Sequence, residues 1–122
     1  MTDYAKLTDR ELDATVAEKV FGHEIGFQGK EPGIVRHKVE GDWETWSSLP
    51  RFSTDVSAAF LVVEEMRTKQ GCAAVLCSPV DRGTKWDVTI GDHDRVAFHG
   101  QASDPSLPRA ICLAALRAVG SK

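Results

Sequence analysis

Two segments of this chain start with the same tripeptide and continue into apolar, alanine-rich stretches. Leu49-Pro50-Arg51 leads into residues 52–66, and Leu107-Pro108-Arg109 leads into residues 110–118. Proline is well tolerated in the first turn of a helix, where its missing N–H costs little, and alanine is the strongest helix former. Both segments therefore predict helices, and the small residues of the second favour close packing on a sheet.

The first and last helices have recognisable ends. Thr8 and Glu11 have the spacing of a capping box, which predicts a helix over about 8–21. Ser106 is the preferred N-cap of the last helix, and Gly120 ends that helix. One face of the last helix is expected to pack on the sheet, and it consists of Leu107, Ile111, Ala114, Ala115 and Ala118.

The middle helix is expected to start near Ser53 or Thr54 and to end at Gly71. Either residue can act as the N-cap, and Asp55 in the first turn then complements the positive end of the helix dipole. Apolar residues at helical spacing predict its buried stripe, which consists of Val56, Ala59, Phe60, Val63 and Met66.

Three strands are expected between the middle and last helices. Residues 72–77 are apolar on both alternating faces, which is typical of a central strand. Residues 85–91 and 95–102 alternate, and the short connection 92–94 favours an antiparallel hairpin. The predicted fold is α+β: a small, mainly antiparallel three-stranded sheet packed with three helices. The first helix is expected to cover what the other two leave, or the second face of the sheet.

Residues 22–50 form an irregular segment between the first two helices. Glycine and proline recur through it, which argues against a long helix. Residues 34–39 are a possible strand, and a turn at 40–42 leads into residues 43–46, so that a small hairpin or a loop is expected here. The element order is therefore α, hairpin or irregular segment, α-β-β-β-α.

Length and composition favour one ordinary intracellular domain. The 122 residues suit a single domain over 1–122, and the net charge of -3 gives no basic field to attract nucleic acid. No apolar run approaches the roughly 20 residues of a membrane helix, and no secretory signal is recognised near Met1. Three cysteines are an odd number for a disulfide framework, so reduced thiols in the cytoplasm are expected, with Cys112 in the core.

Three blocks of the chain resemble, in this order, the phage ABA sandwich domain. They are residues 12–20, residues 52–55 with Ala58-Ala59, and residues 110–116. The resemblance implies helices on both sides of a sheet and a small protein encoded by a phage or prophage, and it carries no catalytic or binding residues. The segment 22–50 lies outside the matching blocks and is insertion-like, so any function peculiar to this chain is to be sought there.

No catalytic, metal or cofactor motif is recognised. His23, His37, His93 and His99 have no metal-binding spacing, so we expect no metal site. Asp92-His93-Asp94 could supply a general base, but the cluster is more typical of a solvated turn. Glycine-rich phosphate loops and nucleophile elbows are both missing from the sequence, so no cofactor is expected and the protein is not expected to be an enzyme.

The candidate binding residues are two tryptophans and the charged residues near them. Tryptophan is enriched at binding hot spots, and it also stacks on bases. The alternative is that the tryptophans close a small core against the first helix, since tryptophan is mostly buried. The residues of this hypothesis are Trp43, Trp46, Asp42, Glu44, Arg51 and Arg36.

These observations favour a phage accessory protein that binds a host protein or protein complex, such as a component of a defence system. A binder of a small ligand such as a nucleotide signal is the alternative, with the tryptophans, Arg36 and Arg51 around a pocket between subunits of a homo-oligomer. Double-stranded-RNA-binding domains share the order α-β-β-β-α, but they need lysines at the start of the last helix, where only Arg109 stands. Nucleic acid and membrane are therefore not expected as partners.

Overall fold

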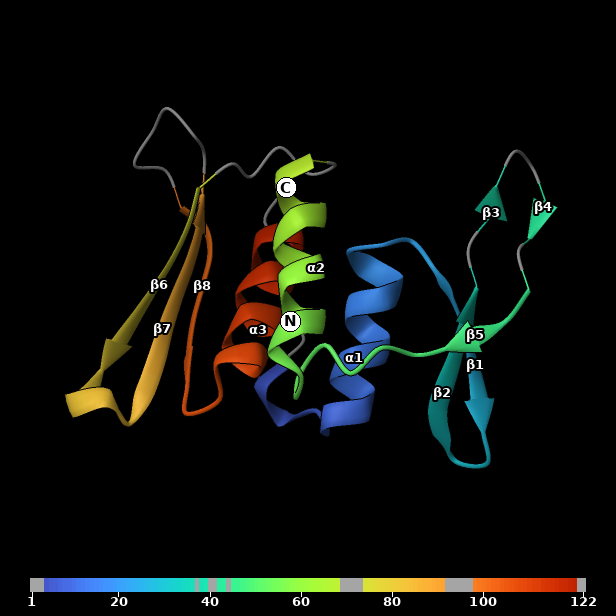
Figure 1. The fold of residues 1–122 in the computed structure, drawn as a ribbon, viewed down its shortest axis with the longest axis horizontal. Helices are drawn as coiled ribbons and strands as arrows, with labels where there is room; N and C mark the ends of the chain where they lie inside the picture. The colour runs from blue at the N-terminus through green and yellow to red at the C-terminus, as the bar shows by residue number, and fades with distance from the viewer. Residues whose placement is uncertain are drawn as a thin grey trace.

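A computed structural model of the protein describes residues 4–36, 38–39, 42–43, 45–68, 74–91 and 98–120. Within these residues, three helices form a layer between two antiparallel three-stranded sheets (Figure 1). The α+β class expected from the sequence is confirmed. The helices are α1 (Asp9–Lys19), α2 (Val56–Thr68) and α3 (Leu107–Gly120), and a short 3-10 helix over Tyr4–Lys6 precedes α1.

The two sheets lie on opposite sides of the helices. The larger sheet has the strand order β6-β7-β8, and the smaller sheet has the order β1-β2-β5. The larger sheet consists of β6 (Ala74–Val80), β7 (Lys85–Gly91) and β8 (Phe98–Asp104), with a 3-10 turn at Asp81–Gly83. The smaller sheet consists of β1 (Glu24–Gln28), β2 (Glu31–Arg36) and β5 (Ser47–Ser48), and a separate pair is formed by β3 (Lys38–Val39) and β4 (Asp42–Trp43).

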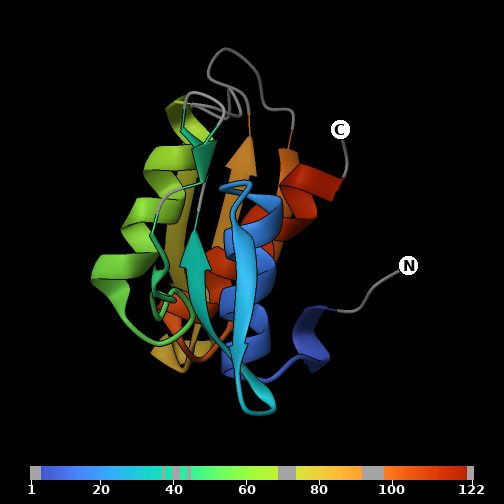
Figure 2. The same ribbon diagram turned by 90° about the vertical axis from the view of Figure 1, so that its right-hand side faces the viewer.

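The layering differs from the arrangement that the resemblance implies. All described helices lie on one side of the larger sheet, whose other face is left open by the described elements (Figures 1 and 2). The prediction that the first helix covers the second face of this sheet is therefore wrong. α1 packs on α3 and on β1 and β2 instead, because its stripe of Leu12, Val16 and Ala17 finds an apolar surface there.

The larger sheet corrects one expectation about strand position. The strand expected over 72–77 is β6, which lies at an edge, whereas β7 is central. β7 matches its expected range, and its pairing with β8 confirms the antiparallel hairpin. Val88 and Ile90 are buried on the face toward α3. Residues 72–73 and the expected turn at 92–94 lie outside the described residues.

α3 is buried on every side over residues 110–116, where one apolar face was expected. Residues 110–116 are all buried, because α3 lies between β7 and β8 on one side and α1 and α2 on the other. A helix that is apolar all round is typical of such a central position. The close packing expected from its small residues is confirmed at Gly100 of β8, where an added Cβ would lie 2.2 Å from the Ala114 carbonyl oxygen.

The predicted N-caps of α1 and α3 are confirmed, and the predicted N-cap of α2 is corrected. Thr8 and Glu11 form the expected capping box, in which the Thr8 N–H donates to Glu11 Oε1 at 2.9 Å. The Ser106 hydroxyl accepts from the backbone N–H of Arg109, as expected of the α3 cap. Neither Ser53 nor Thr54 caps α2: Asp55 Oδ1 accepts from the Ser57 N–H at 2.9 Å, so Asp55 is the N-cap.

The buried stripe of α2 is rotated from the one expected. Ala59, Val62 and Met66 are fully buried, whereas Val56 and Phe60 are exposed. The helix packs its buried stripe along α3, and this contact decides which apolar residues are covered. The expected end of this helix at Gly71 lies outside the described residues.

Residues 22–50 contain more strand than the sequence indicates. β1 and β2 form a hairpin around Gly29, whose φ of 73° requires a glycine-like conformation, and β1 was not expected. The strand expected over 34–39 is divided between β2 and β3. β3 pairs with β4 through Lys38 and Trp43, so the expected small hairpin is confirmed in its pairing.

Candidate interaction surface

The smaller sheet has one face toward the helices and one face away from them. Val35 is buried and Ile25 is partly buried against α1, and neighbours along each strand point to the opposite face. Glu24, Ile34 and Arg36 therefore lie on the face away from α1. We call this the outer face of the hairpin sheet, and the described elements leave it uncovered (Figure 1).

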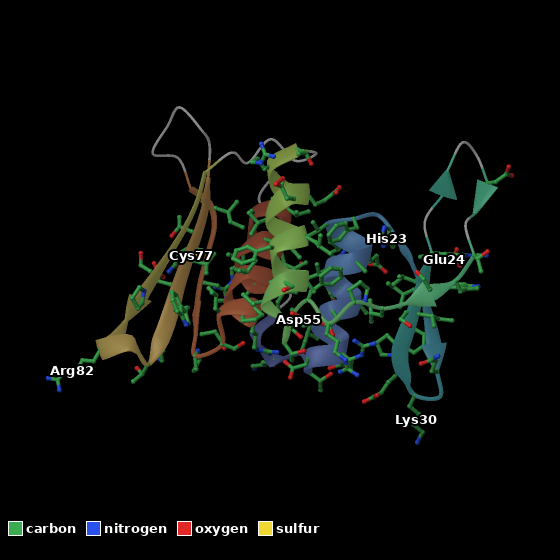
Figure 3. The ribbon with its side chains drawn as sticks, viewed as in Figure 1. His23, Glu24, Lys30, Asp55, Cys77 and Arg82 are labelled. Atoms are coloured by element: carbon green, nitrogen blue, oxygen red, sulfur yellow. The ribbon has the colours of Figure 1, made fainter. Side chains whose placement is uncertain are left out.

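Three side chains of this outer face form a compact group. Arg36 Nη2 lies 3.0 Å from Glu24 Oε2, and Arg36 Nε donates to the same oxygen at 3.1 Å. The guanidinium carbon of Arg36 also lies 4.5 Å from the centre of the Trp46 ring. This is a cation–π contact, typically worth about 0.5–1 kcal/mol at an exposed site. Figure 3 shows Glu24 at this sheet, away from the helical layer.

Trp46 lies over the one glycine of the outer face. A Cβ built on Gly26 would lie 2.6 Å from Ile34 Cγ1 and 3.1 Å from Trp46 Cζ3. An aromatic side chain that covers a strand glycine restores packing that the glycine lacks. Trp46 therefore supports the sheet, yet 37% of it remains exposed. The core-closing alternative does not describe Trp46, because the ring lies on the face away from α1.

The other candidate residues are not brought into this group. Asp42 is exposed on β4, and Trp43 is placed only as the β4 partner of Lys38. Glu44 lies outside the described residues. Arg51 is exposed before α2, where its carbonyl oxygen accepts from the Thr54 and Asp55 N–H groups, and the contacts described for it do not include the group around Trp46. The structure thus unites Arg36 with Trp46 and adds Glu24.

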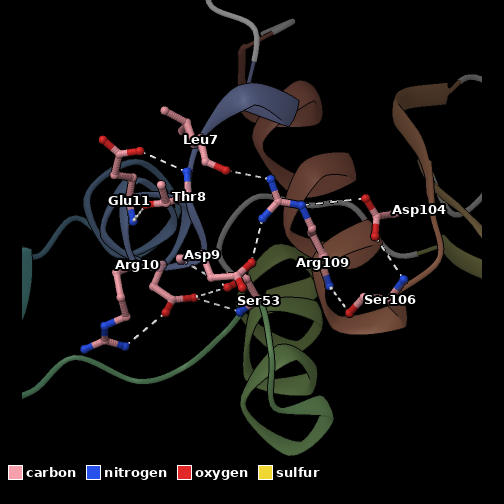
Figure 4. A network of polar contacts seen from close by, with 10 residues as sticks. Leu7, Thr8, Asp9, Arg10, Glu11, Ser53, Asp104, Ser106 and Arg109 are labelled. Atoms are coloured by element: carbon pink, nitrogen blue, oxygen red, sulfur yellow. Dashed lines mark hydrogen bonds and ion pairs between the residues drawn. The ribbon is translucent and has the colours of Figure 1, made fainter.

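A second polar cluster, which the sequence analysis missed, lies inside the molecule. Asp13 is fully buried on α1, and its Oδ1 accepts from the Ser53 N–H at 2.8 Å and from the Ser53 hydroxyl at 2.7 Å (Figure 4). Arg10 donates to Asp13 Oδ2 at 3.0 Å and to the Leu49 carbonyl oxygen at 3.3 Å. The cluster fastens the segment before α2 to α1. Its only sequence signal is an aspartate beside the apolar stripe.

Arg109 connects the start of α3 to the start of α1. Its guanidinium donates to the Leu7 carbonyl oxygen and to Asp9 Oδ1, each at 2.7 Å, and lies 3.6 Å from Asp104 (Figure 4). Its side chain is only 16% exposed. The one basic residue at the position that double-stranded-RNA-binding domains use is thus engaged within the fold.

Two cysteine thiols lie in the described part of the chain, and both have a raised pKa. Cys112 is buried in α3, as expected, and burial raises the pKa of its thiol. Cys77 is exposed on β6, and partial burial of its sulfur still raises the pKa of this thiol. A raised pKa keeps a thiol protonated, and the thiolate is the reactive form.

The histidines give no metal centre within the described part of the chain, where no group of three metal-binding side chains occurs. His23 is partly buried, and its ring centre lies 5.5 Å from that of Phe21. The side chains of His37, His93 and His99 lie outside the described part, and so does the Asp92–Asp94 cluster. The general-base hypothesis for that cluster stays a prediction.

The comparison with known families adds one match. The model of the phage ABA sandwich domain matches residues 14–116, which is more than half of the chain and includes the segment 22–50. The chain matches no curated protein and no solved structure. Among the described residues, no helix has both the length and the apolar character needed to cross a membrane.

Proposed function

Because the chain belongs to the phage ABA sandwich domain family, we propose that it is a phage or prophage accessory protein that binds a host protein in the host cytoplasm. Inhibition of a host defence system is the specific form of this proposal. The outer face of the hairpin sheet, with Trp46, Arg36 and Glu24, is the proposed binding surface.

One observation carries the proposal. An exposed tryptophan and an arginine are held together on a sheet face that the described elements leave uncovered. Arg36 is oriented by Glu24, so both the ring and the guanidinium are positioned before a partner arrives. Preorganised tryptophan and arginine side chains lose little conformational entropy on binding, and these residue types dominate binding hot spots.

A role without catalysis is part of the proposal. The buried carboxylate of Asp13 is occupied by Ser53 and Arg10, and Arg109 is occupied by Leu7 and Asp9. Both clusters hold elements of the fold together. Their contacts support a structural role over proton transfer to a substrate.

Affinity capture from host lysate tests the proposal. Immobilised wild-type protein is expected to retain a host protein that Trp46→Ala and Arg36→Ala lose, with an affinity lowered roughly tenfold or more. Arg67→Ala is the matched control. Arg67 also pairs with a glutamate, Glu64, at 2.8 Å, but it lies on α2 and not on the proposed surface.

Thermal unfolding of each variant shows whether the loss of binding reflects loss of the fold. A partner retained equally by wild type and Trp46→Ala contradicts the proposed surface. If no host protein is retained by both the wild-type protein and Arg67→Ala, the proposed function itself is contradicted.

A nucleotide-type small ligand is the second candidate, because the same Arg36–Trp46 contact combines a stacking surface with a cation. It ranks second because Arg36 already covers one part of the ring and is paired with Glu24. A thermal-shift measurement across a nucleotide panel tests it. A rise in melting temperature that Trp46→Ala abolishes supports this candidate, and a flat response for every nucleotide contradicts it.

A further inference from the structure

Trp46 directly precedes a very short strand. β5 has two residues, Ser47 and Ser48, which pair with Val35 and Ile34 of β2. Strands of globular proteins usually have about 3–10 residues, so β5 by itself supplies few contacts to hold the chain. The position of Trp46 on the outer face therefore also depends on contacts that fix the chain after β5. We call residues 46–53 the connecting segment.

Arg10 of α1 holds the connecting segment one residue after β5. Its Nη1 and Nη2 atoms both lie 3.3 Å from the Leu49 carbonyl oxygen, to which they donate. The Leu49 N–H donates to the Gly33 carbonyl oxygen of β2 at 2.9 Å, and Leu49 itself is buried. Leu49 is thus attached to the smaller sheet by its N–H and to α1 by its carbonyl group.

The same arginine is part of the buried cluster on α1. Arg10 Nη1 donates to Asp13 Oδ2 at 3.0 Å, and the Arg10 side chain is 20% exposed. Asp13 in turn accepts from the N–H and the hydroxyl of Ser53, at the other end of the connecting segment (Figure 4). Hydrogen bonds with charged groups are stronger than those between neutral groups. The Arg10–Asp13 pair therefore attaches the connecting segment to α1 at two points, Leu49 and Ser53.

From these contacts we propose that Arg10 is a positioning residue of the binding surface: by fixing the Leu49 carbonyl group, it holds β5 and keeps Trp46 beside Arg36. The inference rests on the proposed function, in which Trp46 contacts the host protein. Arg10 belongs to α1, which packs on the face of the smaller sheet opposite to Trp46. Its effect on binding is therefore transmitted through the backbone of residues 46–49.

Nuclear magnetic resonance of the Trp46 indole N–H tests the positioning without a partner. The signal is identified by its loss in Trp46→Phe. In Arg10→Ala it is expected to shift and to show a lower heteronuclear NOE, because the ring is held less firmly. The indole signal of Trp86, on β7 of the larger sheet, should stay unchanged and shows that the rest of the fold is intact.

Arg117→Ala is the matched control. Arg117 is also a helix arginine that donates to a strand carbonyl oxygen, that of Gln101 at 2.7 Å, but this contact joins α3 to the larger sheet. Its removal should leave the Trp46 signal unchanged.

The host protein that the wild-type chain retains from lysate provides the second measurement. Its affinity is expected to fall roughly three- to tenfold in Arg10→Ala, because a ring that is not held in place must be ordered on binding. Arg10→Lys keeps the charge beside Asp13 but lacks the planar fork of donors, so both effects should be smaller in this variant than in Arg10→Ala. The same variant keeps the test valid if Arg10→Ala does not fold. Arg117→Ala should bind as the wild-type chain does.

An unchanged Trp46 signal in folded Arg10→Ala would overturn the proposal, as would an unchanged signal in Arg10→Lys where the alanine variant does not fold. So would an affinity that stays the same although the signal shifts, or equal changes in Arg117→Ala, which would indicate a general loss of stability. If the wild-type chain retains no host protein, the proposed function fails, and the Trp46 signal alone then decides whether Arg10 positions the ring.

Discussion

The two three-stranded sheets are built alike but have different relations to the helices between them. The larger sheet buries Val88, Ile90 and Ala102 completely, and its Gly100 allows α3 to approach its backbone. The smaller sheet buries Val35 on its inner face and keeps Ile25 only partly covered.

The faces that point away from the helices also differ. On the larger sheet this face has a polar network, in which the Asp87 carboxylate accepts hydrogen bonds from the side chains of Gln101 and Ser103. On the smaller sheet it has Trp46, Arg36 and Glu24. Stability is therefore concentrated between the larger sheet and α3, whereas the smaller sheet displays side chains suited to recognition.

The largest expected effect is at the contact between the larger sheet and α3. Gly100→Ala would place a Cβ 2.2 Å from the Ala114 carbonyl oxygen and 2.4 Å from the Ala118 backbone nitrogen. Backbone atoms of a buried helix cannot move aside cheaply, so we expect a loss of about 3 kcal/mol or more in the free energy of unfolding, measured by denaturant titration. A loss below about 1 kcal/mol would contradict the close packing described.

The buried cluster that fastens the segment before α2 to α1 comes next. Asp13→Ala would leave the Ser53 N–H and hydroxyl without their buried acceptor, at an expected cost of about 2–3 kcal/mol in the free energy of unfolding. Asp9→Ala serves as the control, because Asp9 is half-exposed and its ion pair with Arg109 is expected to contribute less than about 1 kcal/mol. Equal losses in the two variants would show that the buried cluster contributes no more to stability than the exposed ion pair.

Gly26→Ala repeats the glycine test on the smaller sheet. The new Cβ would meet side-chain atoms of Ile34 and Trp46, which can adjust, so the expected loss is about 1–2 kcal/mol. The same denaturant titration measures this loss beside that of Gly100→Ala. A larger loss for Gly26→Ala than for Gly100→Ala would reverse the comparison between the sheets.

Trp46→Ala should separate recognition from stability. Loss of the cation–π contact and of the cover over Gly26 is expected to cost about 1 kcal/mol of unfolding free energy. Partner binding should fall by more than this, since truncation of a hot-spot tryptophan commonly costs about 2 kcal/mol or more. Thermal unfolding and a binding titration on the same sample measure the two effects.

The smallest expected effect is a pH dependence at the start of α1. Hydrogen bonds with the Thr8 backbone N–H and with the Thr8 side chain hold the pKa of Glu11 below its ordinary value of 4.5. A lowered pKa in the folded state means that the stabilisation is present above the ordinary value and is lost as the pH falls through the lowered one. Glu11→Gln should therefore flatten the fall in melting temperature below about pH 4.5, and an unchanged profile would contradict this role.

Local patterns predicted much of the fold. The capping box at Thr8, the cap at Ser106 and the range of β7 all follow from short-range chemistry and were confirmed. β1 was missed because Gly26 interrupts an otherwise alternating strand. The packing that Gly26 lacks is supplied by Trp46, which lies twenty residues later in the chain, just before β5. In the candidate site, the sequence indicated Trp46 and Arg36. It did not indicate Glu24, because Glu24 is brought beside Arg36 by the unexpected pairing of β1 with β2.

The two identical tripeptides show what local sequence predicts and what it leaves open. Leu49-Pro50-Arg51 and Leu107-Pro108-Arg109 both precede helices, as local propensity and proline geometry require. The packing of distant segments determines that Arg51 is exposed while Arg109 bonds to Asp9, which stands 100 residues earlier, and that the strand β6 lies at an edge. The reason is that caps and alternation depend on neighbours in the chain, whereas burial and strand order depend on which distant surfaces meet.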